Sequence, residues 1–253
     1  MLLVAVQAPL PSAPMARAAA AAGLTAADLG NRLRGTLPRV LLSDADGEHL
    51  RAIGAELEPL GFQTVVCDAR AAPTDAERVV ARTLRLGPRA LVAVDGAGGE
   101  HECPWSMVEA IQRGVRVTTG VEKTTTTETK LDVGRALLSG GLILTRKEKK
   151  VTERKTETSE LFALVQRGDG EPDVILYERR MDYRFLGRDM QPASRGNLEV
   201  LMQRLRAAAP RAAFDDRAAR PGFVSALPAA PVDGADLALF LITLARRYAA
   251  AAG

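Results

Sequence analysis

The chain has 253 residues, of which 47% are hydrophobic and 26% charged, a balance that excludes wholesale disorder. Its two cysteines exclude a disulfide framework, and no apolar run reaches the ~18–20 residues of a membrane span. Pro9 and Pro11 interrupt the N-terminal apolar run, which also lacks the basic start of a signal peptide. We therefore expect a cytoplasmic α+β protein, long enough for two domains.

Residues 1–72 predict a small domain with the element order β-α-α-β-α-β. Short apolar runs predict strands at 1–7, 39–43 and 62–67. The first helix is expected from Pro14 to Ala22, while Thr25 and Asp46 are suitable N-caps for the other two. In the third helix apolar residues recur at helical spacing, at Leu50, Ile53, Leu57 and Leu60.

This element order resembles the C-terminal domain of the bacterial ribosomal stalk protein. The matching residues are Gly23, Leu24, Ala27, Leu33, Leu57, Glu58, Gly61 and Val65. In that family the first helix carries basic residues that contact translation GTPases, whereas alanines (Ala16 and Ala19) stand near the corresponding positions here. The resemblance therefore implies the fold of the family and not its function.

Residues 75–210 predict a second domain made of short antiparallel strands. Strands are expected at 79–86, 90–94, 161–166 and 174–177, with one more at Tyr183, Phe185 and Leu186. A helix capped by Ser194 follows and ends before Pro210, with Leu198, Leu201, Met202 and Leu205 on one face. Antiparallel strands closed by one C-terminal helix are similar to a bacterial pleckstrin-homology-like domain. That resemblance implies a bent sheet with partner-binding loops at its open end.

The C-terminal part predicts a linker at 211–232, which contains three prolines, and a helix at 233–251. One face of this helix carries Leu237, Phe240, Leu241, Leu244 and Tyr248. Such a face packs on the core of the same chain or, alternatively, forms a dimer or partner interface.

The charge of the chain is concentrated in its middle. Residues 112–155 carry 11 basic and 5 acidic side chains, a net charge of +6 against −3 for the rest. Within this region, 122–130 and 147–160 are rich in threonine, lysine and glutamate and have no apolar face. Threonine favours extended backbone, and a strand that is polar on both sides cannot cover a core. We therefore expect a β-ribbon at 115–160 that projects from the second domain.

An apolar segment lies between the two polar runs and is the predicted tip of this ribbon, with Leu137, Leu138, Leu142, Ile143 and Leu144. Basic side chains flank it and are expected to face anions: Arg135, Arg146, Lys147, Lys149 and Lys150. Three hypotheses follow: the tip packs back on the chain, contacts a protein or a second copy, or enters an anionic membrane interface.

The patterns of catalytic, metal and cofactor sites are missing from the sequence. The glycines at 96, 98 and 99 do not form a phosphate-binding motif, and the two histidines, His49 and His101, have no Cys-x-x-Cys partner. The basic region lacks aromatic residues for base stacking, which disfavours nucleic acid. We therefore expect no cofactor, metal or small-molecule substrate. The sequence favours a non-enzymatic adaptor or self-assembly protein; the alternatives are a peripheral membrane protein and an enzyme whose site assembles only in three dimensions.

Overall fold

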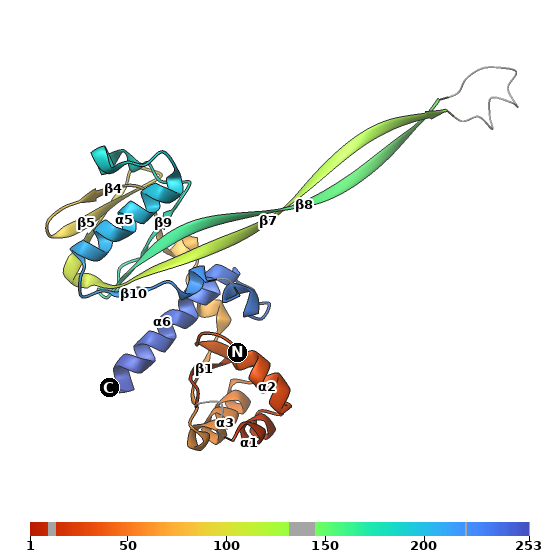
Figure 1. The fold of residues 1–253 in the computed structure, drawn as a ribbon, viewed down its shortest axis with the longest axis vertical. Coiled ribbons are helices and arrows are strands. Elements are labelled where there is room, and N and C mark those ends of the chain that lie inside the picture. Colours follow the sequence, from red (N-terminus) through yellow and green to blue (C-terminus); the bar gives the residue numbers. More distant parts are fainter. Residues whose placement is uncertain (10–13, 132–144, 221, 253) are drawn as a thin grey trace, which may run out of the picture. The chain divides into compact units, whose positions relative to one another are not determined.

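The structure is a computed structural model that describes residues 1–9, 14–131, 145–220 and 222–252. For residues 119–131, 145–157 and 252 it describes the backbone and not the side chains. The chain divides into two compact units, one formed by Met1–Arg116 with Glu160–Gly253 and the other by Val117–Ser159. The first unit combines helices with an antiparallel three-stranded sheet and a mixed seven-stranded sheet (Figure 1). The predicted combination of α and β structure is thus confirmed.

The N-terminal elements follow the predicted order: β1 (Leu2–Gln7), α1 (Met15–Ala21), α2 (Ala26–Leu33), β2 (Arg39–Ser43), α3 (Gly47–Leu57) and β3 (Gln63–Cys67). The strands pair antiparallel in the order β2-β1-β3. The side chain of Thr25 accepts a hydrogen bond from the backbone amide of Asp28, and that of Asp46 from the amide of Glu48. Both N-caps predicted for this domain therefore start their helices. The third predicted cap, Ser194, is instead the first residue of its helix, where Ala193 stands at the N-cap without a side-chain hydrogen bond.

Strand β1 is buried on both faces because its residues alternate between two cores. Leu3 and Ala5 pack with the three N-terminal helices. Leu2 and Val4 pack with the C-terminal helix α6 (Gly234–Ala252) through residues that include Leu237. Helix α6 therefore packs on the core of its own chain.

The seven-stranded sheet has the order β10-β7-β8-β9-β4-β5-β6. Its strands are β4 (Val79–Leu86), β5 (Ala90–Asp95), β6 (Glu100–Pro104), β7 (Val108–Leu131), β8 (Thr145–Arg167), β9 (Val174–Tyr177) and β10 (Ala213–Asp215). The pairs β4–β9 and β10–β7 are parallel, whereas the sequence predicted antiparallel strands. Parallel neighbours need a long crossover connection. Both pairs have one, since about a hundred residues separate β4 from β9 and β7 from β10.

The sheet is strongly bent. Five inter-strand spacings of ~4.8 Å would separate β6 from β7 by about 24 Å in a flat sheet. Only residues 105–107 connect the two strands, and such a link reaches at most about 14 Å. Strand β4 lies at the bend, since its first two residues pair with β9 and residues from Ala81 onward pair with β5.

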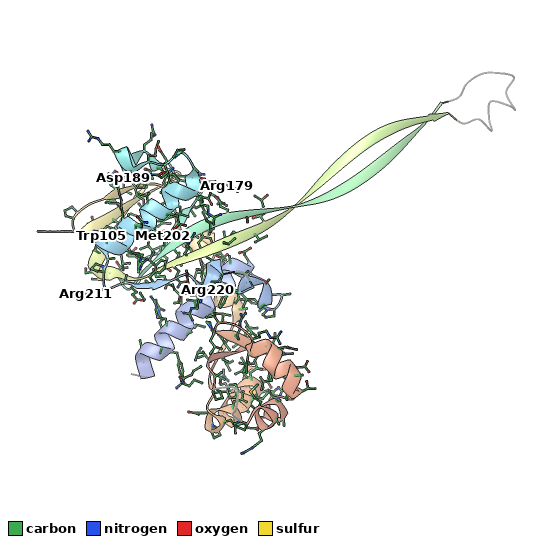
Figure 2. The ribbon with its side chains drawn as sticks, in the orientation of Figure 1. Trp105, Arg179, Asp189, Met202, Arg211 and Arg220 are labelled. Atoms are coloured by element: carbon green, nitrogen blue, oxygen red, sulfur yellow. The ribbon has the colours of Figure 1, made fainter. Side chains whose placement is uncertain are left out.

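Helices cover both faces of the central strands. In β8, Ala163 and Val165 belong to the core formed with α5 (Ser194–Ala208), whereas Phe162 and Leu164 belong to the core formed with α6. Helix α5 buries the face that the sequence predicted: Leu198, Leu201, Met202 and Leu205, of which Met202 is labelled in Figure 2.

Two predicted elements differ in the structure. Tyr183–Asp189 forms two short 3-10 turns that meet at the non-helical Gly187, rather than a strand. The first turn forms because Asp182 accepts a hydrogen bond from the Arg184 amide and the i, i+3 pair Tyr183 and Leu186 is buried. The segment 211–232, predicted as a linker, contains strand β10 and two further 3-10 turns. Its residues Ala218 and Phe223 are buried against β8, β9 and α6.

Candidate interaction site

The second unit consists of the long parts of two neighbouring strands. We call residues 117–131 of β7 and 145–159 of β8 the ribbon; the complete strands have 24 and 23 residues. Both polar runs that the sequence predicted as strands lie in these elements. Figure 1 shows the two strands side by side and twisted about each other.

The predicted site residues are only partly described. The tip residues Leu137, Leu138, Leu142, Ile143 and Leu144, and the flanking Arg135, lie outside the residues that the structure describes. Arg146, Lys147, Lys149 and Lys150 belong to β8, where the backbone is described and their side chains are not. The structure thus places four of the basic residues within a five-residue stretch of one strand, interrupted by Glu148, and leaves the position of the tip untested.

The outer edges of the ribbon strands are not covered by the neighbouring strands. Strand β10 has three residues and pairs with Ala110–Gln112 of β7. Strand β9 has four residues and pairs with Phe162–Val165 of β8. Within the described part of the chain, the ribbon strands therefore have only each other as neighbours. Each presents a row of backbone N–H and C=O groups that another strand could pair with.

The side chains of the ribbon do not provide a hydrophobic face that could stabilise it by burial. Residues 122–130 read Glu-Lys-Thr-Thr-Thr-Thr-Glu-Thr-Lys, which provides no apolar face. An isolated two-stranded ribbon is at best marginally stable in water. Residues 122–130 therefore supply no hydrophobic face that could stabilise the ribbon.

An ion-pair network lies where β7 passes from the ribbon into the first unit. Arg116 donates hydrogen bonds to Asp75 (2.8 Å) and to Asp236 in the first turn of α6 (2.6 Å). The hydroxyl of Tyr177 donates to Asp75 at 2.7 Å. Burial lowers the pKa of Arg116, but the neighbouring carboxylates outweigh it and the pKa is raised overall. Arg116 is therefore held as a cation.

The same network contains a second, more deeply buried pair. The Arg78 side chain is 2% exposed and that of Asp236 is 5% exposed, and their nearest nitrogen and oxygen lie 2.5 Å apart. Asp236 thus accepts from two arginines and joins α6 to the start of β4 and to β7. The arrangement ties three elements together through ion pairs, although the Nε atom of Arg78 has no hydrogen-bond partner among the described residues.

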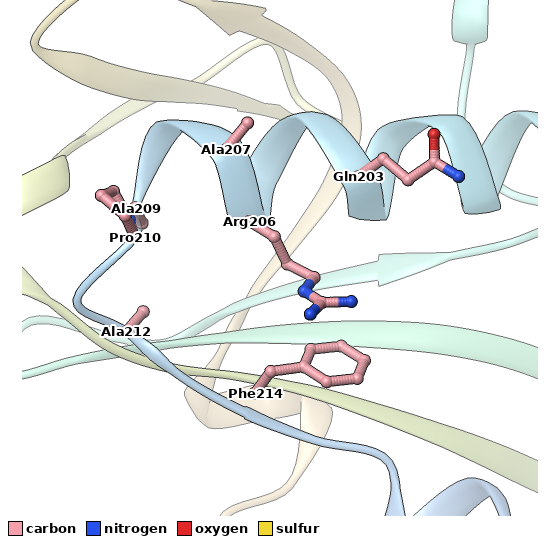
Figure 3. A pocket seen from close by; sticks show the side chains of 7 residues that line it. All are labelled: Gln203, Arg206, Ala207, Ala209, Pro210, Ala212 and Phe214. Carbon is pink, nitrogen blue, oxygen red and sulfur yellow. The ribbon is translucent and has the colours of Figure 1, made fainter.

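A groove lies between α5 and the segment Ala212–Phe214 (Figure 3). It has a volume of about 440 Å³ and is lined by Gln203, Arg206, Ala207, Ala209, Pro210, Ala212 and Phe214. The Arg206 guanidinium lies 4.3 Å above the centre of the Phe214 ring, which is 40% exposed. The lining provides a cation and an aromatic surface but no nucleophile or acid–base pair, so it is suited to binding.

The groups most able to catalyse are engaged elsewhere. His101 pairs with Asp95 (2.9 Å) and His49 with Asp44 (3.0 Å). Burial raises the pKa of the Cys103 thiol, and it raises that of Cys67 to about 11. Among the described residues, no three His, Cys, Asp or Glu side chains gather as metal ligands. Among the described residues, both histidines are thus paired with an aspartate and both thiols are buried.

Sequence reasoning missed the network around Arg116 and Asp236. Its members come from positions 75, 78, 116, 177 and 236, and no local spacing connects them. The sequence offers only weak indications of this network. Arg116 is the last charged residue before the polar run 122–130, and Asp236 stands in the first turn of the helix predicted at 233–251.

Among the described helices, none combines the length and apolar character needed to cross a bilayer. Comparisons with protein-family models, with curated proteins and with solved structures find no match for this chain.

Proposed function

We propose that this protein is a non-enzymatic binding protein that associates with copies of itself, or with a protein partner, through the ribbon. The observation that carries the proposal is that strands of 24 and 23 residues are neighboured by strands of only three and four. Pairing along the uncovered edges would satisfy their backbone groups and extend a two-stranded ribbon into a wider sheet.

The mixture of charges along the ribbon favours self-association. In residues 122–130, Glu122 and Glu128 alternate with Lys123 and Lys130. A second copy can therefore place opposite charges across from each other, and such cross-strand pairs stabilise a sheet. A uniformly basic strand would instead repel its own copy.

The first unit serves as the scaffold in this proposal. A strongly bent sheet closed by α5 supports the resemblance to pleckstrin-homology-like domains, although two of its strand pairs are parallel. The order of the N-terminal elements supports the resemblance to the stalk-protein domain. Neither resemblance provides a function, because fold alone does not specify one.

Molar mass in solution tests self-association. Light scattering over a range of protein concentrations would compare the intact chain, a variant lacking 131–146, and a variant in which 119–157 is replaced by a short glycine-serine turn. We expect concentration-dependent assembly of the intact chain and a monomer without the ribbon. If the variant lacking 131–146 still assembles, the contact is made by the strand edges rather than the tip. Equal mass for the intact chain and the ribbon-less variant at every concentration would contradict self-association.

A second candidate is contact with an anionic membrane surface, favoured by the run Arg146, Lys147, Lys149 and Lys150 in β8. Basic residues near such a surface each contribute about 1 kcal/mol of attraction. Co-sedimentation would compare vesicles of neutral lipid with vesicles containing anionic lipid. Recovery that depends on anionic lipid and is lost when these four residues are changed to glutamine supports this candidate. Equal recovery with both kinds of vesicle rejects it.

A further inference from the structure

A small cavity lies in the first unit among four segments of the chain. It has a volume of about 270 Å³, and its walls come from Ala71 and Pro73, from the start of β4, from β8 and the turn before β9, and from α6. Binding pockets usually measure ~300–1,000 Å³. The size of this cavity therefore restricts a ligand to a small metabolite.

The polar groups of the cavity have opposite charges. Asp173 accepts a hydrogen bond from the Arg167 amide (2.9 Å) and, within the described part of the chain, has no ion-pair partner. Arg78 lines the cavity with a side chain that is almost completely buried, and its Nε has no hydrogen-bond partner among the described residues. Arg247 lines the cavity too, and most of its side chain is exposed. The cavity thus offers a ligand the Asp173 carboxylate, the Nε atom of Arg78, whose other end pairs with Asp236, and the guanidinium of Arg247, which also contacts Glu109 at 3.5 Å.

The remaining wall is mainly apolar, with Leu164 of β8 and Leu239, Phe240 and Leu244 of α6. Its two polar side chains, Gln166 and Thr243, are hydrogen-bonded to each other at 2.7 Å. Each buried CH₂ group of a ligand on such a wall contributes about 0.8 kcal/mol. An aliphatic side chain is therefore the part of a ligand that this wall recognises.

We propose that this cavity binds a free α-amino acid with an aliphatic side chain. The ammonium group pairs with Asp173, the carboxylate accepts from Arg247 and Arg78, and the side chain contacts the leucines. A simple carboxylate would leave Asp173 without a cation, and a simple amine would leave the Nε atom of Arg78 without an acceptor. Only a zwitterion satisfies both kinds of group.

The electrostatics of Asp173 agree with this assignment. Burial raises the pKa of the Asp173 carboxyl, while the amide of Arg167 and the charge of Arg78 act in the opposite direction. A bound ammonium would favour the ionised carboxylate. The cavity therefore holds an acid whose charge a suitable ligand would stabilise.

Calorimetric titration of the full chain tests the proposal with three probes that share one aliphatic skeleton: L-leucine, isoamylamine, which lacks the carboxylate, and 4-methylpentanoate, which lacks the ammonium. We expect leucine to bind with a millimolar or lower Kd and each of the other probes to bind at least about tenfold more weakly. No binding of leucine at tens of millimolar overturns the proposal. Equal binding of either truncated probe overturns the zwitterion assignment.

Two variants locate the site, and neither should prevent folding. Asp173→Asn keeps an acceptor for the Arg167 amide and removes the charge, while Arg247→Met changes a largely exposed side chain. Each should weaken leucine binding by about tenfold or more. The control Glu102→Gln removes an exposed carboxylate of β6, outside the cavity, and should leave Kd unchanged. Unchanged affinity in both cavity variants overturns the assignment, whatever the result of the ribbon experiments.

Discussion

The ring of Phe162 in β8 lies directly against the α-carbon of Gly114 in β7, so that a Cβ at position 114 would come closer than 3.0 Å to three ring carbons. Phe162 is completely buried, and its ring lies 6.0 Å from that of Tyr177, centre to centre. Neither the ring nor the strand can move freely, because the ring is packed in the core beneath α6. The glycine thus allows β7 and β8 to approach each other just inside the first unit.

Gly114→Ala should therefore destabilise the protein. Overpacking of a core commonly costs roughly 1–3 kcal/mol, and denaturant unfolding would measure the loss. The matched control is Gly30→Ala in α2, where a Cβ meets nothing within 4 Å. This control should gain roughly 0.5–1 kcal/mol from reduced backbone entropy. A Gly114→Ala variant as stable as the native chain would show that the contact does not limit the core.

Asp236→Asn should cause a larger loss of stability. The substitution leaves the buried guanidinium of Arg78 and that of Arg116 without the carboxylate that both contact. Breaking a buried pair by removing one partner costs roughly 3–5 kcal/mol. The control Asp216→Asn removes an exposed pair with Arg220, for which a change of about 0–1 kcal/mol is expected. Similar effects of the two substitutions on the free energy of unfolding would exclude a special role for Asp236.

The two thiols should be unreactive in the folded chain. Cys67 and Cys103 are both buried, and burial raises the pKa of Cys67 to about 11. Because the thiolate is the reactive form, a maleimide reagent at neutral pH should modify them only as fast as the protein opens. Labelling followed by mass spectrometry, with and without denaturant, measures this. Rapid modification of the native chain would mean that the core around Cys67 or the core around Cys103 opens readily.

The elements that sequence reasoning predicted are those with a repeating local pattern. Helix α5 follows from Leu198, Leu201, Met202 and Leu205 at helical spacing, and β5 and β9 from short apolar runs between turn residues. The N-caps Thr25 and Asp46 are equally local, since each side chain bonds to a backbone amide two or three residues ahead. In these places the sequence pattern and the tertiary packing require the same conformation.

The features that sequence reasoning missed depend on residues distant in the chain. Strand β10 has three residues and exists because it pairs with β7, about a hundred positions earlier. The parallel pairing of β4 with β9 likewise depends on how distant parts of the chain pack together. Of the candidate sites, the ribbon strands could be predicted because their amino-acid composition is unusual. The cavity at Asp173 could not, because its walls come from four segments that are far apart in the sequence and share no motif.

Acid should weaken the β5–β6 turn through Asp95. The hydrogen bond with His101 and those from the amides of Gly99 and Ala97 lower the pKa of the Asp95 carboxyl below its ordinary value. A carboxyl whose pKa is lower in the folded state stabilises the protein above its unfolded pKa of ~3.9, and this contribution is lost as the pH falls through the folded value. Asp95→Asn removes the titrating group, so the native chain should be more stable than the variant at pH 7 and lose that advantage progressively in acid. Urea unfolding of both proteins from pH 7 to pH 3 measures the difference. A difference that stays constant over this range would mean that Asp95 titrates normally in the folded state.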